Sequence, residues 1–244
     1  MPATNTPTSC QTVSGIYIEP MSPDPQDINL NDIAHCLALA NRWSGNTQYL
    51  SDDQKLGCFK GDPFPYSVAQ HSCHVHDIVV RKFGPRPAHY ALFHDASEAY
   101  LCDIPRPIKP ELTNYYNVEA NLMDAILPKF NVALDEEIKK QVVEIDNAMI
   151  FWERDAIVGQ PVAPYANEHQ HPGESIYYHI PNFCSWSPRR AKAEFIMRAK
   201  YHSSLKLGMT TLAHERHLLN LTLDNIGVTC LHSGLSHLDM QRVA

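Results

Sequence analysis

Residues 93–100 read FHDASEAY, and they close a stretch whose pattern predicts one helix from about residue 87 to residue 100. In a helix, Glu98 lies one turn after His94 and three residues after Asp95, so the three side chains approach one volume of space. Adjacent imidazole and carboxylate groups supply a nitrogen and an oxygen ligand that suit a divalent metal ion. A His-Asp pair is a common dipeptide, however, so its meaning depends on what the rest of the chain offers.

His71 is a second candidate ligand, in the stretch YSVAQHSCHVHDIVV at 66–80. Apolar neighbours share its helical face, which predicts that His71 faces the interior. A lone histidine on such a face is more often a hydrogen-bonded core residue than a ligand. We expect the nearby His74 and His76 not to bind metal.

Asp146 is a third candidate, within the helix predicted for 134–159. It interrupts an apolar stripe formed by Ile138, Val142, Met149 and Ile150. Burying a carboxylate is unfavourable unless a metal, a cation or several backbone donors compensate its charge. A metal shared with His94 and Asp95 would do so; the alternative is an exposed aspartate on a differently rotated helix.

The rest of the chain predicts an all-α protein. Asn31, Ser67 with Gln70, and Ser187 followed by Pro188 are capping patterns for helix starts. Predicted helices span about 31–41, 67–83, 87–100, 113–127, 134–159 and 187–208, with one more at about 211–222. A short strand is expected at 16–18, a long loop at 44–65, and irregular chain at 160–186.

Composition narrows the class of protein. The chain has 244 residues, a net charge of −7 and a pI near 6.0, which argues against coating of duplex nucleic acid. Its seven cysteines form no CxxC pair, and the first residues lack a signal-peptide pattern, so a reduced cytoplasmic protein is expected. No apolar run is long enough to span a membrane.

Taken together, these motifs resemble a known superfamily. His71, His94-Asp95 and Asp146 reproduce the H…HD…D order of HD-domain metal-dependent phosphohydrolases. HDASEAYLCDIPRPIK at 94–109 is similar to the HDxxE…GDxPxPxK segment of bacterial 5′-deoxynucleotidases and phage dATP triphosphohydrolases. ANRWSGN at 40–46 resembles their Arg-Trp substrate segment, and YSVAQHS resembles their first metal helix.

The resemblance covers roughly residues 16–205 and implies an HD-domain helical bundle at 15–205. An irregular arm at 1–14 and an extension at 206–244 flank this domain; the loop insert at 47–63 is not covered. One departure is Cys102, which stands where a glycine usually precedes the aspartate, so the turn that positions Asp103 is expected to be altered.

Carried over by position, the resemblance assigns the site residues. The metal ligands would be His71, His94, Asp95 and Asp146. Glu98 would position the attacking water, with Asp103 as the next candidate carboxylate and the reader of the sugar 3′ side. Arg42 and Lys109 would hold phosphate, and Trp43 would pack on the sugar or base. The implied cofactor is one divalent transition metal, Zn²⁺, Mn²⁺ or Co²⁺, with Mg²⁺ as an alternative.

The resemblance also implies a substrate and a setting. The 51 residues from Asp95 to Asp146 favour a dNTP triphosphohydrolase, with dATP as the first substrate, over a 5′-deoxynucleotidase that acts on dNMPs. A nucleotide-sensing HD domain without activity and a single-strand nuclease are the alternatives from other classes. A homo-oligomer in the cytoplasm, or in the host cytoplasm if phage-encoded, is expected, without membrane or stable nucleic-acid partners.

Overall fold

The structure is a computed structural model that describes residues 8–54, 56–162 and 183–206. These residues are mostly helical, which confirms the helical class predicted from the sequence. The α-helices are α1 (Leu30–Leu39), α2 (Val68–Phe83), α3 (Pro85–Phe93), α4 (Glu98–Leu101), α5 (Tyr115–Lys129), α6 (Glu136–Glu153) and α7 (Pro188–Lys206). Shorter elements are the helical turns η1 (Arg42–Gly45), η2 (Lys109–Glu111) and η3 (Arg154–Val158), and the strands β1 (Cys10–Gln11) and β2 (Tyr17–Ile18).

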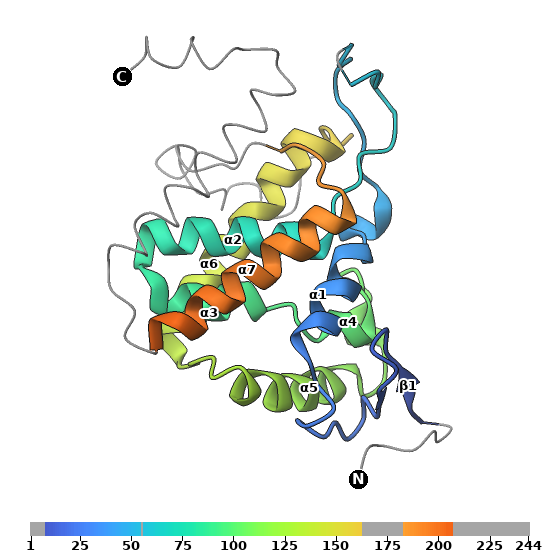
Figure 1. Cartoon of the computed structure of the whole chain (residues 1–244). Coiled ribbons are helices and arrows are strands. Elements are labelled where there is room, and N and C mark those ends of the chain that lie inside the picture. The colour runs from blue at the N-terminus through green and yellow to red at the C-terminus, as the bar shows by residue number, and fades with distance from the viewer. Residues whose placement is uncertain (1–7, 55, 163–182, 207–244) are drawn as a thin grey trace.

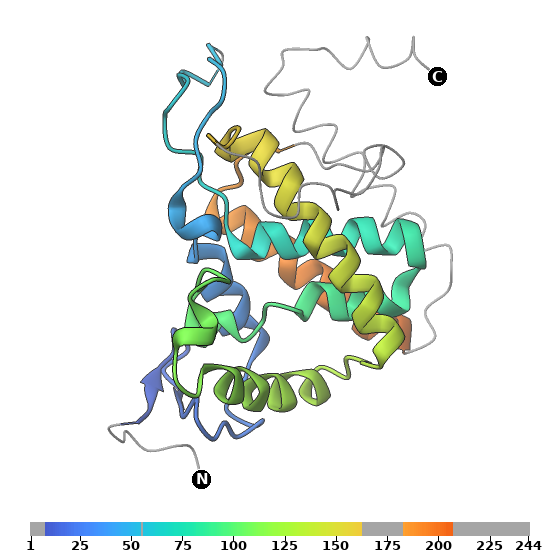
Figure 2. The ribbon, with the colours of Figure 1, turned by 180° about the vertical axis from the view of Figure 1, so that it is seen from behind.

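Helix α2 lies at the centre of the fold and contacts α1, α3, α6 and α7. Figures 1 and 2 show opposite faces of the molecule, with α7 crossing α2 and α3 on one face and α6 crossing them on the other. One apolar cluster joins α1, α2, α5 and α7 around the buried rings of Phe93 and Phe195, whose centroids are 5.5 Å apart. A second cluster joins α2, α3 and α6 around Trp152. Burial of each such side chain contributes about 1.5–3 kcal/mol, so the core fixes the angles between the helices that carry the site.

Two helices begin at the cap residues that the sequence predicts, and a third begins at a different cap. Ser67 caps α2 by accepting a hydrogen bond from the backbone N–H of Gln70, and Ser187 does the same for Arg190 at α7. The cap of α1 is Asn29 rather than the predicted Asn31, because the Asn29 side chain accepts from the N–H of Asp32. Two asparagines two residues apart offer the same local signal, so the sequence alone does not choose between them.

Gln70 does not complete the capping box predicted with Ser67. Its side chain donates to the carbonyl of Cys184 and accepts from the N–H of Trp186. This long-range pair of bonds replaces the local one and fastens the start of α2 to the segment that leads into α7.

The largest difference from the sequence prediction is a break in the helix expected at 87–100. Helix α3 ends at Phe93, residues 94–97 form turns, and α4 begins at Glu98. Within the break, Ala96 N donates to the carbonyl of Phe93, and Glu98 N to that of Asp95. These three-residue spacings tighten the chain relative to an α-helix, which turns the metal-ligand candidates toward α2 and α6.

The predicted loop at 44–65 is irregular in the structure, as expected. Phe64 N donates to Thr47 O, and Gln48 N donates to Ile157 O, so the loop returns to its start and lies against η3. The short strand expected at 16–18 is present as β2, and it pairs with β1 inside the segment expected to be an irregular arm.

Helix α6 continues into η3 and ends at Gly159, as predicted, with a φ of 103° that suits glycine. The described residues leave out most of the irregular segment expected at 160–186, the helix expected at 211–222 and the end of the helix expected at 187–208. No helix in the described ranges is both long and apolar enough to cross a membrane.

Candidate metal and nucleotide site

Three ligand candidates meet at one point beneath the break between α3 and α4. The ligand atoms of His71, His94 and Asp95 all lie within 4.8 Å of one another. Asp95 Oδ2 is 3.3 Å from His94 Nε2 and 3.7 Å from His71 Nε2. Asp146 approaches from α6, with its Oδ1 atom 3.1 Å from His71 Nε2 and 3.7 Å from His94 Nε2. The two nitrogens and two carboxylates predicted from the sequence therefore surround one volume.

Both histidines are oriented by a hydrogen bond at the far side of the ring. The Nδ1 atom of His94 donates to the carbonyl of Ala91 at 2.7 Å, since a carbonyl can only accept. The Nδ1 atom of His71 donates to the carboxylate of Glu153. Each Nε2 atom is thereby turned toward the shared volume, the arrangement usual for histidine ligands of metals.

The residues present fit a divalent cation. Among the described residues, the buried His94 Nε2 and Asp95 Oδ2 atoms have no hydrogen-bond partner. Burial lowers the pKa of His94, but Asp95 and Asp146 outweigh it and raise the pKa to about 9. The volume between these side chains thus favours positive charge. Two of its potential metal-ligand atoms, His94 Nε2 and Asp95 Oδ2, have no hydrogen-bond partner among the described residues, and a metal ion would meet both conditions.

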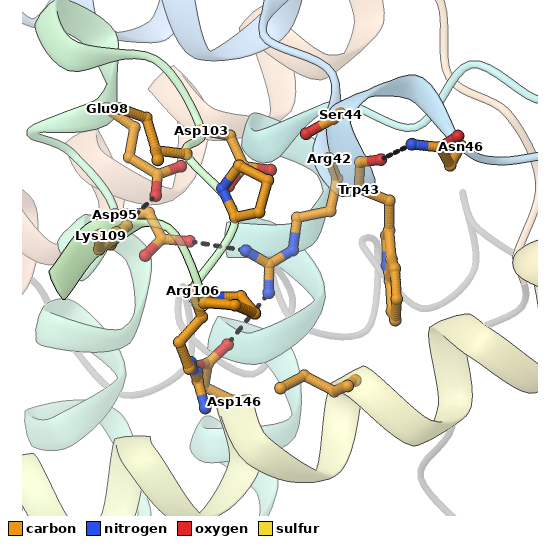
Figure 3. Close-up of a pocket in the computed structure, with 14 residues that line it drawn as sticks. Arg42, Trp43, Ser44, Asn46, Asp95, Glu98, Asp103, Arg106, Lys109 and Asp146 are labelled. Carbon is orange, nitrogen blue, oxygen red and sulfur yellow. Dashed lines mark hydrogen bonds and ion pairs between the residues drawn. The ribbon is translucent and has the colours of Figure 1, made fainter. Parts of the chain in front are cut away.

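Arg42 reaches the same volume from η1. Segment 40–42 is fixed beside the start of α2, because Val68 N donates to Ala40 O and Arg42 N to Tyr66 O, both at 2.9 Å. The guanidinium lies between Asp95 and Asp146, at 3.6 Å and 3.4 Å, as Figure 3 shows. Arg42 is thus a cation directed at the acidic cluster of Asp95 and Asp146, and a phosphate group beside these carboxylates would be within its reach.

Glu153 is a site residue that the sequence analysis missed. It has no exposed surface, and its carboxylate accepts from His71 Nδ1, from Trp43 Nε1 at 2.8 Å and from the Tyr66 hydroxyl at 3.1 Å. Arg42 Nε lies 3.5 Å away. Burial raises the pKa of Glu153, but His71 and Arg42 outweigh it, so the carboxyl stays charged. One buried carboxylate therefore links a metal-ligand candidate to both substrate-binding candidates of η1.

Glu98 and Lys109 form the other wall of the site. Lys109 Nζ lies 3.4 Å from Glu98 Oε1 and 3.1 Å from Glu119 Oε1, while the buried Oε2 atom of Glu98 has no hydrogen-bond partner among the described residues. Burial and the neighbouring carboxylates of Asp95 and Asp103 raise the pKa of Glu98 to about 9. These effects favour the protonated form of Glu98, and Lys109 opposes them.

A cavity of about 380 Å³ opens over these groups. Pockets for small ligands commonly measure about 300–1,000 Å³, and the volume of this cavity lies within that range. Polar lining residues are Arg42, Trp43, Ser44, Asn46, Asp95, Glu98, Asp103, Arg106, Lys109 and Asp146 (Figure 3). The structure therefore gathers the predicted substrate-binding residues and the acidic cluster around one cavity.

Sequence comparison relates the chain to two proteins that are named as uncharacterized. No protein-family model matches it. It is 32% identical over 153 residues to the uncharacterized protein RCAP_rcc00048 of Rhodobacter capsulatus, covering 60% of this chain and 71% of that protein. The chain belongs to the family of this protein. It is also 33% identical over 124 residues to the uncharacterized protein YfdR of Escherichia coli K12, covering 50% of this chain and 58% of YfdR. Neither name states a function, so the function is argued from the site.

Asp103 lines the cavity although Cys102 stands where a glycine usually precedes this aspartate. Cys102 has a φ of 66°, in the left-handed region where glycine is favoured, so it adopts the conformation available to the expected glycine. This conformation costs of order 1–3 kcal/mol for a residue with a Cβ. Asp103 still lines the cavity, and burial raises its pKa.

Two residues of the site, Glu153 and Arg106, are only weakly indicated by the sequence. Glu153 lies seven residues after Asp146, two helical turns along the same face of α6, which is the spacing of residues that approach one site. Arg106 sits between two prolines in DIPRPIK, within the segment 94–109 that carries the resemblance, but the resemblance assigns it no role. In the structure its guanidinium contacts Asp146 Oδ2 at 3.3 Å.

Proposed function

We propose that this chain is a metal-dependent phosphohydrolase of the HD superfamily that acts on deoxynucleotides. The observation that carries the proposal is a pair of buried atoms, His94 Nε2 and Asp95 Oδ2, that have no hydrogen-bond partner among the described residues and lie beside a cavity lined by three cationic side chains. A bound metal ion would be a partner for these two atoms, and an anionic substrate would be a partner for the cationic side chains.

The residues that would hold the metal are His71, His94, Asp95 and Asp146. A mixed set of nitrogen and oxygen donors favours Zn²⁺, Mn²⁺ or Co²⁺ over Ca²⁺. When bound, the ion would supply Lewis-acid polarisation of a phosphoryl oxygen and would neutralise charge that develops during hydrolysis.

The protein's own side chains would divide the remaining work. Arg42 presents a guanidinium that can bind two phosphate oxygens at once, which a lysine cannot do. Glu98 would orient the attacking water through its Oε2 atom, which has no hydrogen-bond partner among the described residues, and would accept the water's proton once Glu98 is itself deprotonated. Lys109 beside Glu98 favours the charged, proton-accepting form of that carboxyl group.

The favoured reaction is hydrolysis of a deoxynucleoside triphosphate, with dATP as the first candidate. Water attacks the α-phosphorus, the bond from that phosphorus to O5′ breaks, and O5′ gains a proton. The products are the deoxynucleoside and triphosphate. Support comes from the resemblance in residues 94–109 and from the short spacing between Asp95 and Asp146.

Trp43 is the proposed basis for preference against ribonucleotides. It lines the cavity, and its indole is fixed because Nε1 donates to the buried Glu153. A rigid indole beside the sugar would exclude a 2′-hydroxyl by overlap, which acts on fit rather than on the chemical step.

The test is a substrate panel. Purified protein is incubated with each dNMP, dNTP and rNTP plus Mn²⁺, Co²⁺ or Zn²⁺, and products are identified by chromatography, with Asp95→Ala as the inactive reference. Release of deoxyadenosine and triphosphate from dATP supports the favoured reaction. Hydrolysis of dNMPs alone replaces it with the 5′-deoxynucleotidase, and binding without turnover replaces it with a nucleotide sensor.

A further inference from the structure

The cavity is lined by three cationic side chains that differ in how far they are exposed to solvent. The side chains of Arg42 and Lys109 are 14% and 17% exposed, and each is held by two or more carboxylates. The Arg106 side chain is 65% exposed. Among the described lining residues it is therefore the cation that can most readily exchange its present partners for a ligand.

The partners of Arg106 fix its place at the rim of the site. Its guanidinium lies 3.3 Å from Asp146 Oδ2 and donates to Asn147 Oδ1 at 3.0 Å, both on α6. Asp146 Oδ1 is occupied by His71 and Arg42, so Arg106 meets the oxygen of this carboxylate that is turned away from the metal-ligand cluster. Arg42 thus contacts both Asp95 and Asp146 within the site, and Arg106 lies further out.

The backbone at Arg106 is held in place although its side chain is exposed. Pro105 and Pro107 flank it, and the ring of each proline fixes its own φ. Pro107 also restricts the backbone conformation of Arg106, the residue before it. Ile108 N donates to the carbonyl of Pro105 at 2.8 Å and closes the turn. A fixed backbone with an exposed guanidinium is suited to binding an anion at a defined distance from His71, His94 and Asp95.

We propose that Arg106 binds the β- and γ-phosphates of a nucleoside triphosphate and so sets a preference for triphosphates over monophosphates. This inference rests on the proposed function, of which it names the substrate class. Leaving Asp146 and Asn147 costs little, because the Arg106 side chain is exposed to water and Asp146 keeps His71 and Arg42 as partners. Polyphosphate oxygens return the same two hydrogen bonds to a planar guanidinium and carry more negative charge.

The experiment compares Arg106→Gln with Arg86→Gln. Arg86 is the matched control, since it is also exposed, at 70%, and is paired with a carboxylate, Asp135, at 2.8 Å. Calorimetric titration measures binding of inorganic triphosphate, as its magnesium complex, and of orthophosphate. Where the parent is active, kcat/KM for dATP and for dAMP is measured as well.

Arg106→Gln should weaken triphosphate binding by about ten- to a hundredfold, the range for hydrogen bonds to charged groups, and leave orthophosphate binding within about twofold. Arg86→Gln should change neither. Equal loss for both anions would overturn the inference, because Arg106 would then act only through Asp146. Unchanged triphosphate binding would also overturn it, as would a parent that binds triphosphate no more tightly than orthophosphate. A parent that binds triphosphate through Arg106 but hydrolyses no nucleotide would refute the proposed function alone.

Discussion

Replacing Glu153 by glutamine should lower the free energy of unfolding of the metal-free protein by about 3 kcal/mol. Glutamine has the same size, so no cavity forms, and the loss comes from one buried charge and its hydrogen bonds. The carboxylate accepts from three donors and neutralises Arg42, and breaking such a buried pair costs about 3–5 kcal/mol. The lower end applies because Arg42 retains Asp95 and Asp146.

Urea unfolding, followed by circular dichroism in the presence of a chelator, measures this loss. Glu144→Gln is the control, since Glu144 is also a carboxylate of α6 but is 47% exposed and pairs with Lys82. Its effect should stay within about 0.5 kcal/mol, as expected for a surface pair. A second readout is metal affinity, which should fall about 10- to 100-fold in Glu153→Gln, because His71 loses the partner that orients it.

A loss below about 1 kcal/mol in Glu153→Gln would refute the reasoning, since a buried carboxylate that four groups depend on cannot be removed so cheaply. Loss of stability with unchanged metal affinity would refute only the link from Glu153 to the metal-ligand cluster.

Three further predictions concern other groups. Glu98→Ala should keep its fold and metal content but lose about two to four decades of turnover, measured as the initial rate of deoxynucleotide hydrolysis; a rate within a few-fold of the parent would transfer the role to another carboxylate. Trp43→Ala should narrow the ratio of kcat/KM between dATP and ATP, and an unchanged ratio would remove Trp43 from sugar selection. Asp77→Asn should lose about 3 kcal/mol of stability at pH 7, because Arg198 binds Asp77 through two hydrogen bonds and, despite burial, holds its pKa well below the usual value. A depressed pKa contributes stability that is present above the unfolded value near 3.9 and is lost as the pH falls. The difference between Asp77→Asn and the parent should therefore stay constant from pH 7 to about pH 5 and shrink below about pH 4, which urea unfolding across that range checks.

Helix positions followed from the sequence where local signals decide them. Ser67 and Ser187 cap helices through bonds to residues three positions ahead, and Gly159 ends a helix because its φ is positive. The break at 94–97 was not predictable, since the helical pattern runs on through it. Gln70 likewise satisfies a local motif but bonds to residues more than 100 positions away.

The same contrast holds for the site. The resemblance implied His71, His94 and Asp95 as metal ligands, and the structure brings these three side chains together. Glu153 was not predicted, because its importance comes from Trp43 and His71, which are 110 and 82 positions away. The homo-oligomer and the cytoplasmic location stay predictions.

Metal content measured together with hydrolysis tests the central claim most directly. Metal-free protein is titrated with Mn²⁺ or Co²⁺, bound metal is counted by mass spectrometry after removal of free ions, and dATP and dAMP hydrolysis are followed in the same samples. Asp95→Ala is compared with Glu144→Ala, an exposed carboxylate on α6. The account predicts one ion per chain in the parent and in Glu144→Ala, with hydrolysis rising in proportion to bound metal, and neither metal nor activity in Asp95→Ala. Undiminished hydrolysis in the metal-free protein, or full metal content and normal turnover in Asp95→Ala, would contradict it.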